Sequence, residues 1–233
     1  MKICLFGITG IPLGKHNVKD PRMDQVHQLV EAQKKAYAQV DVVSDKEMPT
    51  CDAILTSHAA LSDLLMKDLD FVESRLSRGP AESEKVVLQK IADGLVSEIA
   101  VSAMGLSADE LAAISAHNLT SSRPVVVADD AELAAPDTVW AKALKQGGYI
   151  SYLTVGGKEN RAWPIRNGLN AWEAAGAIHT DIQKGFIRAE IISFADLIEA
   201  GGETQAKRAG KQRLELKTYI MQDYDVTNFR FNK

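Results

Sequence analysis

The stretch CLFGITGIPLGKHNVKDPRMDQV, residues 4–26, contains an apolar run, a glycine-rich loop and a helix start. The apolar run KICLFGI (2–8) has the length and composition of a buried strand. Asp20 and Pro21 begin a helix well, because Asp is a preferred N-cap and Pro is favoured at the first helical position. Apolar residues then recur at helical spacing, which predicts a helix from Pro21 to about Tyr37.

Further apolar runs follow this helix. AQVDVV (38–43), CDAILTS (51–57) and RPVVVADD (123–130) read as buried strands. Strands that alternate with helices along a chain are typical of a parallel sheet covered by helices. We therefore expect residues 1–60 and 120–150 to form one α/β core.

Residues 61–119, between these strands, have a helical pattern. Two apolar stripes, within residues 61–76 and 86–99, are separated by Gly79 and Pro80. Two amphipathic helices joined by a Gly-Pro turn predict an antiparallel helical hairpin, inserted between strands of the core.

The pattern changes to α+β after about residue 150. Strands are expected at YISYLTV (149–155), RAWPI (161–165), GFIRAEII (185–192), LELKTYI (214–220) and DVTNFRF (225–231), with helices at NAWEAAGAIH (170–179) and SFADLIEAGG (193–202). A mixed sheet that packs around one helix is the β-grasp plan. We expect it for residues 151–233.

Composition and charge limit the possible classes. The chain has 233 residues, of which 45% are hydrophobic, and a net charge of −4, so no overall basic character points to nucleic acid. From Ser151 onward there are 12 Lys and Arg against 10 Asp and Glu, and the part before it has 15 against 21, which suggests two units with different partners. No apolar run approaches the roughly 18 residues that span a bilayer. We expect a cytoplasmic protein without membrane contact, with Cys4 and Cys51 as buried thiols.

The loop after the first strand has only part of a phosphate-binding motif. A working loop, G-x-x-x-x-G-K-[ST], wraps phosphates with backbone amides, contacts them with Lys and binds magnesium through the hydroxyl. Here Gly10 and Gly14 are separated by three residues, and Lys15 is followed by His16. The helix starts only at Asp20, so its N-terminus does not support the loop. We predict a glycine-rich turn and no cofactor; the alternative is residual binding of ATP or GTP with Mg²⁺ by Gly10, Gly14 and Lys15.

Other candidate chemistry is weak. The five histidines show no metal-ligand spacing, and no nucleophile motif accompanies His179 and Asp181, so we predict no metal site and no catalytic residue. Asp129 and Asp130 beside Glu132 leave a hard-cation site open as the alternative to a solvated strand end.

Basic residues gather in the C-terminal part. Five of them fall within eleven residues: Lys207, Arg208, Lys211, Arg213 and Lys217. A second cluster combines basic and aromatic residues: Lys184, Phe186 and Arg188, with Phe229, Arg230 and Phe231 at the end of the chain. Such groups contact phosphates and bases of nucleic acids. Glu203 and Glu215 dilute the run, so a charged, solvated surface is the alternative.

The C-terminal part closely resembles a known family. The segments AAGAIHTDIQKGFIRAEII (174–192) and YIMQDYDVTNFRF (219–231) are long and specific. They resemble the C-terminal TGS-type domain of the YchF / Obg-like ATPases, and the resemblance extends over most of residues 151–233.

The N-terminal part resembles the same family with losses at each nucleotide motif. FGITGIPLGKHN (6–17) is similar to its P-loop with one residue deleted and the Ser/Thr lost. DPRMDQVHQLV (20–30) is similar to an Asp-Pro-Arg segment that lies well downstream in the family, so the first helix and switch I are missing. Ser44 takes the glycine position of the D-x-x-G motif, and Asp129 stands where the base-specificity motif has Asn. LLMKDLDFVESRL (64–76) resembles the first helix of the family's coiled-coil insertion.

The resemblance implies an α/β fold with three parts: a reduced, degenerate P-loop GTPase-like parallel-sheet core, an inserted helical hairpin and a TGS-like β-grasp domain. It also implies a YchF-like protein that has lost NTP hydrolysis and acts as a non-catalytic binding module for the ribosome, RNA or a protein partner. One alternative is a residual ATP- or GTP-binding protein with weak NTPase activity. Another is a structural paralogue that forms a homo-oligomer or pairs with an intact family member.

Overall fold

The structure is a computed structural model, and it describes residues 1–232. The strands are β1 (Lys2–Phe6), β2 (Gly14–Val18), β3 (Lys34–Ala36), β4 (Ala38–Val43), β5 (Ala53–Ser57), β6 (Val125–Ala128), β7 (Tyr149–Thr154), β8 (Glu159–Arg166), β9 (Phe186–Ile192), β10 (Arg213–Glu215) and β11 (Val226–Phe231). The α-helices are α1 (Pro21–Leu29), α2 (His58–Ser77), α3 (Glu82–Val96), α4 (Ala108–Ile114), α5 (Asp130–Ala134), α6 (Asp137–Gln146), α7 (Ala171–Ile178), α8 (Thr180–Lys184), α9 (Phe194–Ala200) and α10 (Glu203–Arg208). Short 3₁₀ helices lie at η1 (Asp45–Thr50), η2 (Val101–Ala103), η3 (Ser115–His117) and η4 (Thr120–Ser122).

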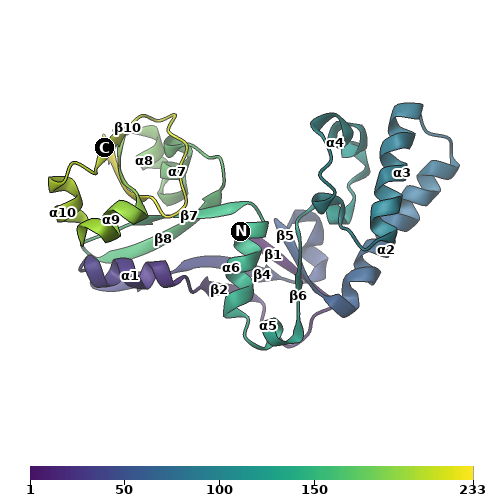
Figure 1. Cartoon of the computed structure of the whole chain (residues 1–233), viewed down its shortest axis with the longest axis horizontal. Coiled ribbons are helices and arrows are strands. Elements are labelled where there is room, and N and C mark those ends of the chain that lie inside the picture. Colours follow the sequence, from purple (N-terminus) through teal and green to yellow (C-terminus); the bar gives the residue numbers. More distant parts are fainter. Residues whose placement is uncertain (233) are drawn as a thin grey trace. The chain divides into compact units, whose positions relative to one another are not determined.

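The first sheet has the strand order β2-β4-β1-β5-β6 (Figure 1). β1 pairs in parallel with β4 and β5, and β5 pairs in parallel with β6. Leu5 lies opposite Leu55, which in turn lies opposite Val126, and all three side chains are buried. Continuous apolar strands of this kind are typical of a parallel sheet covered on both faces. The expected parallel-sheet core is confirmed.

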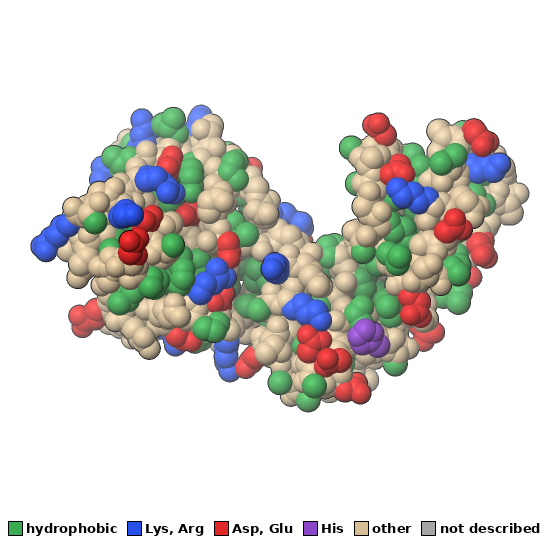
Figure 2. Space-filling model, in the orientation of Figure 1, with side chains coloured by type: hydrophobic (Ala, Val, Ile, Leu, Met, Phe, Trp, Pro, Cys, Tyr) green, Lys and Arg blue, Asp and Glu red, His purple; other side chains and the backbone are tan. Residues whose placement is uncertain are grey.

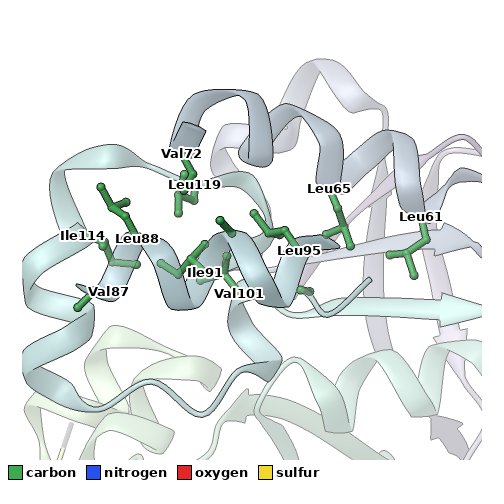
Figure 3. Packing of buried hydrophobic residues seen from close by; sticks show 12 residues of the cluster. Leu61, Leu65, Val72, Val87, Leu88, Ile91, Leu95, Val101, Ile114 and Leu119 are labelled. Atoms are coloured by element: carbon green, nitrogen blue, oxygen red, sulfur yellow. The ribbon is translucent and has the colours of Figure 1, made fainter. Parts of the chain in front are cut away.

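The helical hairpin is formed by α2 and α3, which lie side by side (Figure 1). Its apolar side chains point into a shared core that also takes up residues from η2, α4 and η4 (Figure 3). The buried carboxylate of Asp68 on α2 accepts hydrogen bonds from the backbone N–H groups of Thr120 and Ser121, both at 2.7 Å. These hydrogen bonds hold η4 against the hairpin, together with the segment that leads into β6.

The second sheet has the order β10-β9-β11-β7-β8-β3 and mixed strand directions. β9 is antiparallel to β10 and β11, β7 is antiparallel to β8, and β11 runs parallel to β7. α7 packs against β8 and β9, and the buried Tyr152 hydroxyl donates to the Ala174 carbonyl at 2.9 Å. A mixed sheet that holds one main helix confirms the β-grasp expectation for the C-terminal part.

The helix expected from Pro21 to about Tyr37 is wrong in its second half. α1 ends at Leu29, and Val30 already has an extended conformation. The next residues form β3, in which Ala36 lies opposite Arg161 of β8. Pairing with an edge strand distant in sequence outweighs the local helix propensity of this polar segment. The strand expected over 214–220 is also shorter, since β10 ends at Glu215.

The chain divides into two compact units that differ from the expected division. Among the described residues, one unit contains Met1, residues 16–40 and residues 148–232, and the other contains residues 2–15 and 41–147. Residues 16–40 were expected in the core with 1–60. Within this range, α1 and β3 lie with the second sheet, because β3 extends that sheet beside β8 and Asn160 donates to the Val30 carbonyl at 2.7 Å. β2 and the first residues of β4 still pair in the first sheet. Within the described residues, no helix is both long enough and apolar enough to cross a membrane.

Candidate functional site

The glycine-rich loop leads into a strand, not into a helix. After β1 ends at Phe6, the chain passes Gly10 with φ +85° and enters β2 at Gly14 with φ +111°. Lys15 lies in β2 with an exposed side chain and no ion pair within residues 1–232. In a phosphate loop the helix N-terminus supplies free amides and a favourable dipole. That support is missing here, and residual phosphate binding by these residues stays a prediction.

Gly7, at the start of the same loop, has a packing role. Its φ is +65°, and a Cβ at this position would lie 2.3 Å from the Ala60 Cβ in the first turn of α2. Such an approach is far below van der Waals contact, so only glycine lets the loop lie against α2. The glycine content of the loop therefore has a structural reason that requires no ligand.

The acidic residues at the end of β6 form a helix cap. Asp129 is the N-cap of α5 and accepts from the Glu132 N–H at 2.7 Å, and the Glu132 carboxylate accepts from the Asp129 N–H at 3.0 Å. Lys142 also donates to Glu132 at 3.0 Å, and this hydrogen bond lowers the pKa of Glu132. Within the described part of the chain, no cluster of three His, Cys, Asp or Glu side chains is arranged to hold a metal ion.

His179 and Asp181 also serve the local fold. His179 is the N-cap of α8, and its Nδ1 accepts from the Asp181 N–H at 3.1 Å. The pair belongs to the hydrogen-bonded, exposed start of a helix.

The Asp-Pro-Arg segment is fastened to the second sheet. Asp20 caps α1 by accepting from the Arg22 N–H at 2.9 Å, and the Arg22 guanidinium returns to Asp20 at 2.7 Å. The same guanidinium donates to Asp223 at 2.7 Å and lies 3.6 Å from the centre of the Tyr224 ring. The segment thus joins α1 to the loop before β11, a role that nothing in the sequence indicated.

Three of the candidate basic residues are paired with acids. Lys207 contacts Glu203 at 2.6 Å, Lys211 contacts Asp196 at 3.0 Å and Arg213 contacts Glu215 at 3.1 Å. Figure 2 shows this alternation of basic and acidic side chains over the region of α10 and β10. An exposed ion pair leaves less net charge for a partner, so these three are weaker candidates than their sequence spacing suggests.

Lys184, Arg188 and Arg208 are exposed and have no acidic partner among the described residues. Phe186, expected to present its ring, is only partly exposed. It packs beside Phe229 at a centroid distance of 5.9 Å and joins the core of the second sheet. Regular alternation would put Phe186 and Arg188 on the same face of β9. The β9–β11 register shifts between them, from Arg230 opposite Arg188 to Phe231 opposite Phe186, and this irregularity lets Phe186 turn inward while Arg188 stays exposed.

Arg188 lies directly opposite Arg230 in the β9–β11 pair, so two like charges share one face of the sheet. Glu190 is on the same face and accepts from the Arg230 guanidinium at 2.7 Å and from Asn228 at 2.8 Å. Burial raises the pKa of Glu190, but these hydrogen bonds outweigh it and leave the pKa below its usual value. Glu190 was not singled out from the sequence, although the alternation in FIRAEII already places it beside Arg188.

Arg188, Arg230 and Glu190 define a basic sheet face. Lys184 and Arg208 are further exposed cations of the same unit. One buried carboxylate balances one of the two opposed arginines and leaves Arg188 uncompensated. Such a face can hold the phosphates of a nucleic acid or the carboxylates of an acidic protein.

These observations define the class of protein: it has a parallel α/β core with an inserted helical hairpin, and a second domain built on a mixed sheet. Residues 149–232 match the family YchF-GTPase_C, which is described as a protein of unknown function (DUF933). The C-terminal domain therefore belongs to the YchF C-terminal domain family, and the recognition of the YchF / Obg-like ATPases is confirmed.

Curated relatives match over the same segment. It is 57% identical over 82 residues to the ribosome-binding ATPase YchF of Haemophilus influenzae, covering 35% of this chain and 23% of that protein. It is 52% identical over 85 residues to the protein of the same name from Bacillus subtilis, covering 36% and 23%. Obg-like ATPase 1 of Danio rerio is 49% identical over 81 residues, covering 35% and 20%. The match thus spans about a quarter of the length of these relatives.

The structure extends the likeness to the rest of the chain. It superposes on the structure of the Schizosaccharomyces pombe YchF GTPase with a TM-score of 0.76, covering 99% of this chain and 97% of the other, at 18% sequence identity. At this identity the comparison shows a shared fold. The parallel-sheet α/β core and the second domain with its mixed sheet are thereby confirmed as the architecture.

Proposed function

We propose that the protein is a non-catalytic, cytoplasmic binding module of the YchF type, whose β-grasp domain contacts the ribosome through ribosomal RNA. The relatives that share its C-terminal domain are named ribosome-binding ATPases, which supports this type of partner. Of the two activities in those names, the proposal assigns ribosome binding to this protein and does not assign ATP hydrolysis.

The observation that carries the proposal is the opposition of Arg188 and Arg230 across β9 and β11. Like charges directly opposite one another destabilise a sheet, so an exposed pair of this kind is best explained by an anionic partner. Glu190 offsets only one of them, and it is buried among its own hydrogen bonds. The phosphate backbone of RNA supplies negative charge that exposed Arg and Lys side chains can neutralise.

The loss of NTP hydrolysis is supported by the loop geometry. Gly14 and Lys15 belong to β2, and the next helix begins only at Pro21. Asp129, at the expected base-specificity position, is occupied as a helix cap. Binding without nucleotide-driven switching is the function that remains for a chain of this design.

The test is a triple charge reversal, K184E/R188E/R208E, compared with wild type for co-sedimentation with purified ribosomes and for binding to ribosomal RNA fragments over a range of salt. We expect the reversal to weaken binding at least about tenfold and to reduce the slope of log K against log salt by about two, since each lost phosphate contact removes about 0.7–0.9.

A matched control is K46E/R78E/K145E, which changes the net charge equally at exposed cations of the other unit that form no ion pair within residues 1–232. It should bind like wild type. Equal binding by both triple variants, or no ribosome binding by the wild-type protein, would refute the proposal.

A further inference from the structure

A cavity of about 420 Å³ lies within the unit that contains the second sheet, away from the basic sheet face just described. β2, β3, β4 and β8 all contribute to its lining. Its volume falls in the roughly 300–1,000 Å³ range of small-molecule sites. The cavity exists because β3 pairs with β8, a pairing that the sequence did not predict, and the chain then continues through Tyr37 into β4.

Two aromatic side chains line the cavity, and both are held by hydrogen bonds. The Trp163 Nε1–H donates to the Thr154 hydroxyl at 2.9 Å, and the Tyr37 hydroxyl donates to Asp24. Trp163 lies on β8 and Tyr37 between β3 and β4. Aromatic rings fixed in this way offer a stacking surface for a nucleobase, and the side chains lose little rotamer freedom when the base binds.

Amide side chains face the same cavity. The Gln39 amide donates to the Asn17 side-chain oxygen at 3.0 Å, and both residues are exposed to solvent. Each amide carries donors and acceptors that this single bond does not use. They can therefore pair with the edge of a base, which presents donors and acceptors of its own.

The cations of the cavity are balanced by carboxylates. Lys35 donates to Asp24, and Arg161 donates to Glu159 at 2.7 Å. Each cation also lies near a ring: Lys35 Nζ is 4.9 Å from the centre of Tyr37, and Arg161 Cζ is 5.0 Å from the centre of Trp163. Because both cations are already paired with carboxylates, the cavity suits a flat, polar, largely neutral group better than a free anion.

We propose that this cavity binds an unstacked nucleobase, presented either by a free mononucleotide or by a single-stranded RNA. The base stacks on Trp163 or Tyr37, and its edge is read by Asn17 and Gln39. The sugar-phosphate part extends to solvent past Lys35 and Arg161. This binding does not depend on the basic sheet face, and it is expected to respond little to salt, because counterion release needs unbalanced cations.

The experiment follows Trp163 fluorescence in a W172F background. Trp172 is 43% exposed and lies outside the cavity, and Trp140 is fully buried, so in this background Trp163 is the tryptophan that an added base can reach. The protein is titrated with AMP, GMP, CMP and UMP, and separately with six-nucleotide single-stranded RNAs of each base. We expect saturable quenching by at least one base.

Y37A and N17A/Q39A test the site without removing the reporter. We expect each of these substitutions to raise the Kd obtained from the quenching titration by about tenfold. Mononucleotides should quench Trp163 in the triple variant K184E/R188E/R208E with the same Kd as in the protein without these three substitutions. Quenching by mononucleotides and RNA alike assigns the base itself as ligand; quenching by RNA alone assigns a single strand. No saturable quenching by either probe, or quenching that Y37A and N17A/Q39A leave unchanged, overturns the proposal.

Discussion

Asp20 shows how one side chain can have two structural tasks. It is the N-cap of α1, and it also holds the Arg22 guanidinium that reaches Asp223 and Tyr224. Burial raises its pKa, but the hydrogen bonds and charge of Arg22 outweigh this, so the pKa of Asp20 is lowered. The cap was predictable from the local pair Asp20-Pro21, whereas the partners of Arg22 come from residues about two hundred positions later.

Asp20→Asn is expected to lower the free energy of unfolding by about 1 kcal/mol at pH 7, since the side chain is partly exposed and Asn still caps the helix. A carboxyl with a lowered folded pKa stabilises the fold above its unfolded pKa of about 3.9 and loses this contribution as pH falls through the lower folded value. Urea unfolding at several pH values measures the difference in the free energy of unfolding between wild type and Asp20→Asn. This difference should be constant between pH 5 and 7 and should become smaller below about pH 4. Glu31→Gln, at an exposed acid that forms no ion pair within the described part of the chain, is the control and should show no such narrowing.

The hairpin shows how far a pattern can predict an element. The apolar stripes and the Gly-Pro turn correctly predicted α2 and α3. They did not distinguish the residues that pack from those that do not: Ile91 is fully buried, whereas Val86, in the same stripe, is 62% exposed. Which apolar side chains are covered depends on η2, α4 and η4, which lie elsewhere in the sequence.

Ile91→Ala should therefore lower the free energy of unfolding by about 2–5 kcal/mol, because it removes buried methyl groups and leaves a cavity. Val86→Ala, on the same helix, should change it by less than about 0.5 kcal/mol. Chemical denaturation followed by far-ultraviolet circular dichroism measures both. Equal effects of the two substitutions would mean that α3 does not pack as described.

At the scale of the whole molecule, the nucleotide motifs are altered together. Calorimetric titration of ATP or GTP with Mg²⁺ should show no binding tighter than about 100 μM, which corresponds to roughly 5.5 kcal/mol. Lys15→Ala should bind and unfold like wild type, because Lys15 is exposed in β2. Mg²⁺-dependent binding that Lys15→Ala abolishes would restore the loop as a phosphate site. Weak binding that Y37A removes would instead belong to the cavity beside β8.

Local sequence patterns were enough to predict the two sheets, the inserted hairpin and the family of the C-terminal domain. These features depend on periodicity, caps and contiguous motifs, such as Asp20-Pro21 and residues 174–192, which are complete within short segments. Other features became visible only in the folded chain: residues 34–36 form a strand, Lys207 and Lys211 are ion-paired, and Arg188 lies opposite Arg230. Strand pairing and charge pairing join residues that are far apart in the chain. A local secondary-structure propensity of a few tenths of a kcal/mol per residue is too small to outweigh these interactions.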